Sequence, residues 1–218
     1  ETKNKCASSK IHLELLDLGD FDSHHSIVAG VIKNHGPIDH LIHCGGISQR
    51  SLVKDTLLSV DEKLMAINYL GTVSLTKAIL PHFLEKKQGH FTVITSLTGV
   101  FASPYRSGYA ASKHALHGFF DSLRAELEDQ GIRVTLAAPG FVKTKVSINA
   151  LTGDGTNLGS MDDAQAKGIS AEACAQKTIR AIATNKREVY IGRESYAAYV
   201  KRYLPGLFAR LIKKAKVR

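Results

Sequence analysis

Cysteine is scarce in this chain of 218 residues, and long apolar runs are missing from it. Its three cysteines, Cys6, Cys44 and Cys174, are odd in number and far apart, which argues against a disulfide framework and favours a reducing compartment such as the cytoplasm. No stretch approaches the roughly 20 consecutive apolar residues of a membrane span. The sequence therefore excludes a disulfide-stabilised module and offers no candidate membrane-spanning helix.

Metal-ligand spacing is missing as well, although the chain has ten histidines. Protein metal sites are built from His, Cys, Asp and Glu at short, regular spacings. No such pattern with a carboxylate or thiol partner is found around the histidines that cluster in the sequence, which are His24, His25, His40, His43, His114 and His117. We therefore expect no bound metal ion.

Acidic residues are missing from the end of the chain, and this accounts for most of the formal net charge of +9. Seven cations lie there: Lys201, Arg202, Arg210, Lys213, Lys214, Lys216 and Arg218. Apolar and aromatic residues recur at helical spacing in the same segment. Two interpretations fit residues 196–218: an amphipathic helix attracted to anionic lipid, or a helix packed on the domain or a partner subunit with its lysines in solvent. No nucleic-acid-binding module is recognisable, so we expect no nucleic-acid partner.

What the sequence does contain is an alternation of short apolar runs with longer helical patterns. We expect strands at 12–18, 38–43, 91–96, 133–138 and 188–191, and helices at 21–34, 58–87 and 107–130, the second of them interrupted by Gly71 and kinked or broken at Pro81. This order predicts an α/β fold in which a doubly wound parallel sheet carries helices on both faces. The 44% hydrophobic content suits one domain, which we assign to residues 1–195, followed by the basic amphipathic segment 196–218.

One group of side chains indicates a chemistry. Tyr109 and Lys113 are four residues apart on an expected helix, so they project from one face with Cβ atoms about 5–6 Å apart. The positive charge favours the phenolate, which can exchange a proton with an alcohol oxygen. Ser96 closes an expected strand, and the carboxyl ends of strands are where open α/β sheets bind ligands. The spacing Ser-x12-Tyr-x3-Lys therefore predicts acid–base chemistry at an alcohol or carbonyl oxygen.

These residues, with Asn68 in INYLG and the run PGFVKT at 139–144, resemble the short-chain dehydrogenase/reductase family in order and spacing from about Asp17 to Thr144. Within the family, the chain is most similar to the dehydrogenase/reductase member 7B-like subgroup. The resemblance implies a Rossmann-like fold and an NAD(P)-dependent oxidoreductase that interconverts a carbonyl and an alcohol. The subgroup is described as NADP-linked, so NADP is slightly favoured over NAD, and as membrane-associated in animals.

The resemblance also implies a role for each matching residue. Tyr109 would be the general acid and base, Lys113 would support it and hold the nicotinamide ribose, and Ser96 would polarise the carbonyl. Asn68 would hold a water molecule that links Lys113 to solvent. The residues implied to contact the cofactor are Asp17, Cys44, Gly45, Gly46, Tyr109, Lys113, Pro139, Gly140, Val142 and Thr144.

The sequence departs from the family pattern at two places. The glycine-rich phosphate turn after the first strand is missing with the rest of the first βαβ segment, so we expect the sequence to be part of a longer chain. Without that segment the strand 12–18 has no neighbour to pair with, and the strand 38–43 exposes an edge. The run His43-Cys44-Gly45-Gly46 stands where the family usually has Asn-Asn-Ala-Gly, and we interpret Cys44 as a small buried residue rather than a reactive thiol.

The stretch after Thr144 is polar and punctuated by glycine, as in a segment that covers a substrate. Its apolar residues are candidate pocket walls and suggest a lipid-like or steroid-like substrate: Val146, Ile148, Leu151, Leu158 and Met161. The resemblance further implies a small-molecule carbonyl or alcohol substrate and a homodimer or homotetramer.

Three functions remain open on the sequence. The first is the oxidoreductase, which we favour because Asn68, Ser96, Tyr109 and Lys113 all carry the required side chains. The second is an inactive binding or scaffold protein of the same fold, suggested by the missing phosphate turn. The third is a peripheral membrane protein that acts through its basic tail. Both the cytoplasm and a membrane surface are therefore candidate locations.

Overall fold

Four parallel strands form the sheet, in the order β1 (His40–His43), β2 (Gly89–Ile94), β3 (Ile132–Pro139) and β4 (Glu188–Ile191). The computed structural model describes residues 10–215, so Cys6, Lys216 and Arg218 lie outside the described residues. In register, Leu41 lies opposite Phe91, and Phe91 opposite Val134. The prediction of a parallel α/β sheet is confirmed.

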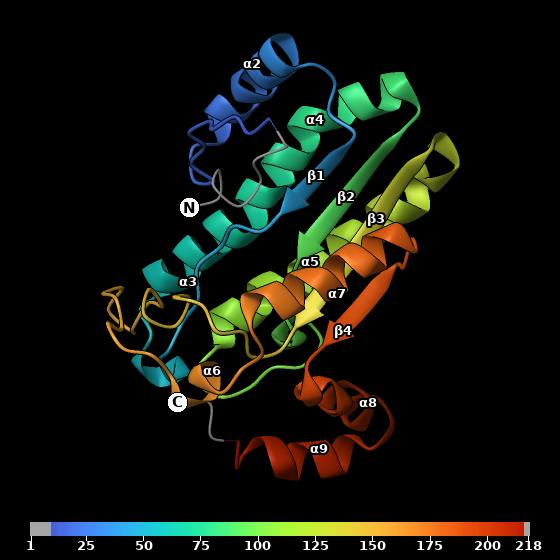
Figure 1. Cartoon of the computed structure of the whole chain (residues 1–218). Helices are drawn as coiled ribbons and strands as arrows, with labels where there is room; N and C mark the ends of the chain where they lie inside the picture. Colours follow the sequence, from blue (N-terminus) through green and yellow to red (C-terminus); the bar gives the residue numbers. More distant parts are fainter. Residues whose placement is uncertain (1–9, 216–218) are drawn as a thin grey trace.

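Helices cover both faces of this sheet (Figure 1). Packed on one face are α2 (His24–His35), α4 (Thr72–Lys86) and α5 (Ser107–Leu127). The opposite face of β3 and β4 is covered by α7 (Ala171–Ala183), which the sequence analysis did not predict. The shorter elements are α3 (Leu58–Met65), which packs on α5, and α6 (Asp163–Ala166).

The main core lies between the sheet and the helix pair α4 and α5. Phe83 of α4, Phe91 of β2 and Phe120 of α5 are fully buried there. The ring of Phe91 lies 5.0 Å from that of Phe83 and 6.2 Å from that of Phe120, measured between centroids. Side chains alternate along each strand, so β2 and β3 present Phe91 and Val134 to this core and the intervening residues to the opposite face.

The predicted helix 58–87 contains one break in its α-helical pattern. Between α3 and α4 the chain makes a π-helical turn, Ala66–Gly71, whereas α4 continues through Pro81 without a break. The turn ends at Gly71, where the backbone of Leu18 comes close. A Cβ on Gly71 would lie only 2.1 Å from the carbonyl oxygen of Leu18. Only glycine allows this approach.

The prediction of a strand at 12–18 is wrong. Residues 10–17 have no regular secondary structure, and Leu13 and Leu15 are exposed. A strand needs a neighbour that offers free backbone groups. Residues 12–18 instead lie against the helices: the Asp17 carbonyl oxygen bonds the His24 ring 3.0 Å away, and Leu16 and Leu18 pack on the main core. In the described structure β1 is therefore an edge strand of a four-stranded sheet, with Ile42 half exposed.

After β4, two short helices fold back beside the carboxyl end of the sheet: α8 (Tyr196–Tyr203) and α9 (Pro205–Ile212). Phe208 and Ile212 of α9 pack on Leu97 and Phe101, with the Phe101 and Phe208 ring centroids 5.6 Å apart. Lys201 donates to the carbonyl oxygen of Val100 at 2.7 Å. The packed interpretation of the tail is therefore correct for one face of α9.

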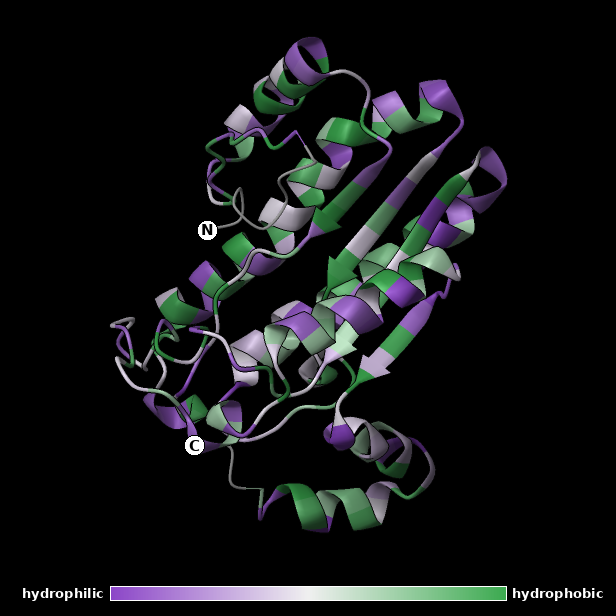
Figure 2. Ribbon diagram, viewed as in Figure 1, coloured by the Kyte–Doolittle hydropathy of each residue, from purple (hydrophilic) through white to green (hydrophobic). Residues whose placement is uncertain are grey.

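The other face of α9 is uncovered. Leu204, Leu207 and Leu211 are about half exposed, and Figure 2 shows α9 as a largely hydrophobic helix at the edge of the molecule. Exposed cations flank this row, namely Arg202, Arg210, Lys213 and Lys214. Within residues 10–215, every helix is too short or too polar to cross a bilayer.

Candidate active site

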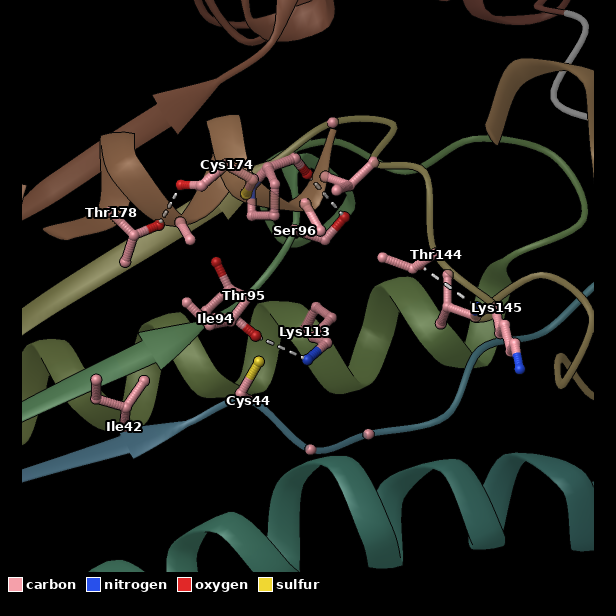
Figure 3. A pocket seen from close by; sticks show the side chains of 18 of the residues that line it. Ile42, Cys44, Ile94, Thr95, Ser96, Lys113, Thr144, Lys145, Cys174 and Thr178 are labelled. Atoms are coloured by element: carbon pink, nitrogen blue, oxygen red, sulfur yellow. Dashed lines mark hydrogen bonds between the residues drawn. The ribbon is translucent and has the colours of Figure 1, made fainter. Parts of the chain in front are cut away.

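A cavity of about 680 Å³ opens at the carboxyl ends of β1, β2 and β3 (Figure 3). This volume is in the range of small-molecule sites. The loops after these strands, the first turns of α5 and one side of α7 form its walls. The lining includes these residues predicted from the sequence: Cys44, Gly45, Gly46, Ser96, Tyr109, Lys113, Pro139, Gly140, Val142 and Thr144.

Ser96 lies two residues beyond β2 and caps a short 3-10 turn, Leu97–Gly99. Its Oγ accepts hydrogen bonds from the Thr98 backbone N–H at 3.1 Å and from the Thr98 hydroxyl at 2.9 Å. Its own proton is directed to the Pro139 carbonyl oxygen across a long 3.4 Å contact. Both acceptor positions of the hydroxyl are used, so Ser96 can bind a ligand only as a donor, by turning its proton away from the long contact with Pro139.

Tyr109 and Lys113 lie one turn apart near the start of α5. The Lys113 Nζ atom is 5.9 Å from the centroid of the Tyr109 ring and donates to the carbonyl oxygen of Ile94 at 3.1 Å (Figure 3). Lys113 is buried, yet it lines the cavity. An ammonium held by one carbonyl keeps two further N–H groups for a ligand or for the phenol.

Asn68 does not line the cavity but supports it from the π-helical turn. Its Oδ1 accepts from the Ile47 N–H at 2.8 Å, and its Nδ2 donates to the Ile47 carbonyl at 2.9 Å and to the Ser112 hydroxyl at 3.0 Å. Asn68 thereby ties the loop after β1 to α5. Gly46 fits here because a Cβ at this position would lie 2.8 Å from Asn68 Oδ1.

The run 139–144 forms the third wall. The Gly140 N–H donates to the Ile191 carbonyl at 2.7 Å, which keeps the chain beside β4 as it leaves β3. The Gln165 side-chain amide donates to the Val142 carbonyl and lies 3.5 Å from the Thr144 hydroxyl. This wall is therefore fixed from β4 on one side and from α6 on the other.

His43 is the last residue of β1, and Cys44 begins the loop after it. Cys44 is exposed and lines the cavity, so its interpretation as a buried residue is wrong. Cys44 directly follows β1, which is the edge strand of the sheet over residues 10–215, and its side chain is therefore left exposed. His43 is buried and bonds the Thr76 hydroxyl of α4 at 2.9 Å, and burial, with Lys113 nearby, lowers its pKa to about 3. It therefore ties β1 to a helix rather than to a strand.

Asp17 is not among the cavity-lining residues. Its carboxylate accepts from the Gly19 N–H at 2.8 Å in the turn before α2. Its contact with a cofactor stays a prediction.

The predicted pocket walls are mostly elsewhere. Val146 lines the cavity, but Ile148, Leu151, Leu158 and Met161 do not. Leu151 is instead buried with Val60 and Leu64 of α3. The missing wall comes from α7, through Cys174, Ala175, Thr178, Ile179 and Ile182. Ser170 caps this helix by accepting from the Ala173 N–H at 3.1 Å, and a serine before a periodic apolar run is the sequence signal that was missed.

Together, the fold and the cavity define a class of protein: an open parallel α/β domain with polar side chains gathered at the carboxyl ends of its strands. Residues 1–154 match the family model described as short chain dehydrogenase. The chain belongs to the short-chain dehydrogenase family.

Sequence comparison also identifies relatives within this family. The chain is 43% identical over 198 residues to a mouse protein named Dehydrogenase/reductase SDR family member 7B, covering 90% of this chain and 61% of the relative. It is 44% identical over 201 residues to an Anopheles gambiae protein named Dehydrogenase/reductase SDR family protein 7-like, covering 91% and 63%. The chain thus spans about three-fifths of the length of these relatives.

Solved structures share the fold at lower identity. A short-chain dehydrogenase from Streptomyces avermitilis has a TM-score of 0.81 at 21% identity, covering 97% of this chain and 81% of the other. A short-chain dehydrogenase/reductase from Burkholderia phymatum, solved in complex with NAD, has a TM-score of 0.80 at 16% identity, covering 94% and 80%.

Proposed function

We propose that the protein is an NAD(P)-dependent oxidoreductase that interconverts a carbonyl and an alcohol. The observation that carries this proposal is the meeting of Ser96, Tyr109 and Lys113 at one cavity, from two elements that join at the carboxyl end of the sheet. Family membership supports it, as does the complex of a structural neighbour with NAD.

The residues at this cavity fit the nicotinamide end of such a cofactor. Lys113 offers N–H groups to ribose hydroxyls, and the backbone of the run 139–144 with the Thr144 hydroxyl offers partners to a carboxamide. Gly45 and Gly46 leave the floor beside them free of side chains. When bound, the cofactor supplies or accepts the hydride. NADP is favoured over NAD on the likeness to the 7B-like relatives.

The protein residues manage the proton. In the reduction direction, the Tyr109 phenol gives its proton to the substrate oxygen as that oxygen gains electron density, and takes it back in the oxidation direction. Lys113, close to the ring, stabilises the phenolate that is left. Ser96 donates a hydrogen bond from its hydroxyl to the same substrate oxygen, keeps its own proton, and fixes the position of that oxygen. Asn68 maintains the floor of the site through Ile47 and Ser112.

The cavity walls support an apolar substrate. The apolar side chains of Val146, Ala175, Ile179 and Ile182 line the same cavity as the polar groups of Ser96, Tyr109 and Lys113. Such an arrangement binds an apolar body and orients one oxygen. We therefore propose lipid-like or steroid-like carbonyl compounds as the substrate class, and by likeness to the family a homodimer or homotetramer.

Cofactor binding tests this proposal before any substrate is known. NADPH and NADH are titrated separately into the full natural protein, and the fluorescence of the reduced nicotinamide is followed. We expect saturable binding to the wild-type protein, tighter for NADPH than for NADH. Lys113→Ala should weaken the affinity at least about tenfold, because it removes hydrogen bonds to the cofactor and roughly 1.4 kcal/mol of lost binding free energy corresponds to a factor of ten. Lys186→Ala, a change of a lysine outside the cavity, is the control. Absence of binding by a folded protein would favour the alternative, an inactive binding or scaffold protein.

A second activity, contact with a membrane surface, is favoured by the uncovered face of α9. Leu204, Leu207 and Leu211 form a half-exposed apolar row, with Arg202 and Arg210 among the cations beside it. Anionic lipid satisfies both features at once. A second copy of the same face fits less well, since two-fold pairing would bring like charges together. We propose that this face rests on anionic bilayers.

Co-sedimentation with vesicles tests the membrane contact. The protein should sediment with phosphatidylserine–phosphatidylcholine vesicles and not with phosphatidylcholine alone. Leu207→Asp with Leu211→Asp should weaken this by about 100-fold or more, because burying each leucine contributes roughly 1.5–3 kcal/mol. Leu58→Asp, which changes an exposed leucine of α3, is the matched control. Equal sedimentation of the double variant and the wild-type protein would refute the contact.

A further inference from the structure

The first turn of α5 has no capping side chain from the residue that precedes it. The N-cap position is Arg106, whose side chain makes no cap hydrogen bond. The first four N–H groups of any helix lack partners within the helix. Gly108 lies in this turn and loses more conformational entropy than any other residue type on becoming helical. The turn that carries Tyr109 therefore depends on groups from elsewhere in the chain.

Gln49 supplies the missing cap from the loop after β1. Its Oε1 accepts from the Gly108 N–H at 2.9 Å and from the Tyr109 N–H at 3.2 Å. The side chain is completely buried. It is not among the residues that line the cavity, so its contacts are with the helix and not with a ligand.

Hydroxyl groups hold the other end of the Gln49 amide. Its Nε2 lies 3.0 Å from the Ser51 hydroxyl, 3.2 Å from the Thr56 hydroxyl and 3.4 Å from the Ser107 hydroxyl. The Ser51 and Thr56 hydroxyls are themselves 2.7 Å apart, and the Thr56 hydroxyl donates to the Leu52 carbonyl. Only one orientation of the Gln49 amide forms all these hydrogen bonds, because the flipped amide would point its own N–H groups at the N–H groups of Gly108 and Tyr109.

We propose that Gln49 is a positioning residue for Tyr109: it fixes the first turn of α5 so that the phenol stays aligned with Ser96 and Lys113. The inference rests on the proposed oxidoreductase function for its effect on turnover. Misplacement of a catalytic group by about 1 Å can cost about 100-fold in rate. Because Gln49 acts through the backbone of Tyr109, its loss should lower kcat while the cofactor site stays intact.

Two substitutions separate this role from a general contribution to stability. Gln49→Met keeps the length of the side chain and removes every hydrogen bond. Gln49→Glu keeps two oxygen acceptors for the N–H groups of the turn, and the hydroxyls of Ser51, Thr56 and Ser107 can rotate to donate to it. A carboxylate is also favourable at a helix N-terminus. Val28→Ala, a buried change in α2 far from the cavity, is the control for destabilisation alone.

The first measurement is hydrogen exchange of the Gly108 and Tyr109 amides in the full natural protein, which requires no turnover. Protection of both amides should fall at least tenfold in Gln49→Met, return to within about threefold of wild type in Gln49→Glu, and stay unchanged in Val28→Ala. Unchanged protection in Gln49→Met would overturn the proposal.

The second measurement is the division between kcat and KM. Gln49→Met should lower kcat by about 30–100-fold with the dissociation constant of NADPH changed by less than threefold, and Gln49→Glu should recover most of kcat. A folded Gln49→Met with wild-type kcat, or a Gln49→Glu as impaired as Gln49→Met, would overturn the proposal. A third outcome separates the two proposals. If the Gly108 and Tyr109 amides lose protection in Gln49→Met as expected, but the wild-type protein binds neither NADPH nor NADH, the oxidoreductase function is refuted and the role of Gln49 in the turn is supported.

Discussion

Tyr109→Phe should lower kcat by about 10²–10⁴-fold, the contribution usual for a positioned acid–base group. The substitution deletes one hydroxyl and keeps the ring, which is half-buried beside Val60 and Leu64. Affinity for NADPH should change by less than about threefold, because Lys113 and the run 139–144 are untouched. The measurement pairs a nicotinamide fluorescence titration with the rate of NADPH oxidation by the best substrate from a screen of lipid aldehydes and steroid ketones.

The control for this prediction is Tyr196→Phe, which removes the hydroxyl of an exposed tyrosine in α8. It should keep both the wild-type rate and the wild-type affinity. If Tyr109→Phe turned over as fast as an active wild-type protein, another group would have to be the proton donor. If it lost NADPH binding instead, the phenol would be holding the cofactor rather than moving a proton.

Asp162→Asn should lower the free energy of unfolding by about 3–5 kcal/mol. Asp162 is buried just before α6, and one carboxylate oxygen lies 2.6 Å from Arg50 Nη2 and 3.6 Å from Arg106 Nη2. Burial and the neighbouring Arg50 already lower the pKa of Arg106 to about 10, an effect that the Asp162 charge opposes. The isosteric asparagine removes that negative charge and leaves the buried guanidinium groups of Arg50 and Arg106 to repel each other.

Urea unfolding monitored by circular dichroism measures this loss. The matched control is Glu128→Gln, which breaks the Arg187–Glu128 pair, 2.8 Å long and largely exposed. That change should cost no more than about 1 kcal/mol. Equal midpoints for Asp162→Asn and wild type would mean that the buried pair contributes no stability and that the chain between β3 and α7 is held by its other contacts.

The sequence predicted those parts of the site whose geometry is local. Tyr109 and Lys113 share a helix face because four residues make about one turn, and Ser96 follows a strand whose apolar run is unmistakable. The strands β1 to β4 could be predicted for the same reason. Their order in the sheet is their order along the chain, in keeping with the tendency of consecutive strands to lie side by side.

Contacts between distant segments could not be predicted in this way. Arg50 and Asp162 are 112 residues apart, and no pattern along the chain indicates that one pairs with the other. Gln49 reaches Tyr109 across 60 residues, and its neighbours Ser51 and Thr56 look like ordinary loop residues. The prediction of a strand at 12–18 was wrong for a related reason. The apolar residues of this segment indicate burial, but whether the segment packs on a strand or on a helix depends on which elements lie beside it.

The π-helical turn at Ala66–Gly71 has a consequence for how the chain tolerates changes in length. Val60 and Leu64 pack with Tyr109 of α5 and with Leu151, whereas Ile79 and Phe83 face the sheet. In a continuous α-helix, Leu64 and Leu75 would lie on nearly the same line, because 11 residues make about three turns. The π-helical turn takes up about one extra residue, so α4 is rotated relative to α3 by about 100° from its position in a continuous helix. Deleting a single residue between 66 and 71 would leave Leu64 and Leu75 in a continuous α-helix with about the same angle between them, because one residue fewer turns the helix back by about 100°. Both apolar stripes would therefore keep their partners, and the chain can lose one residue here at the cost of the π-helical turn alone.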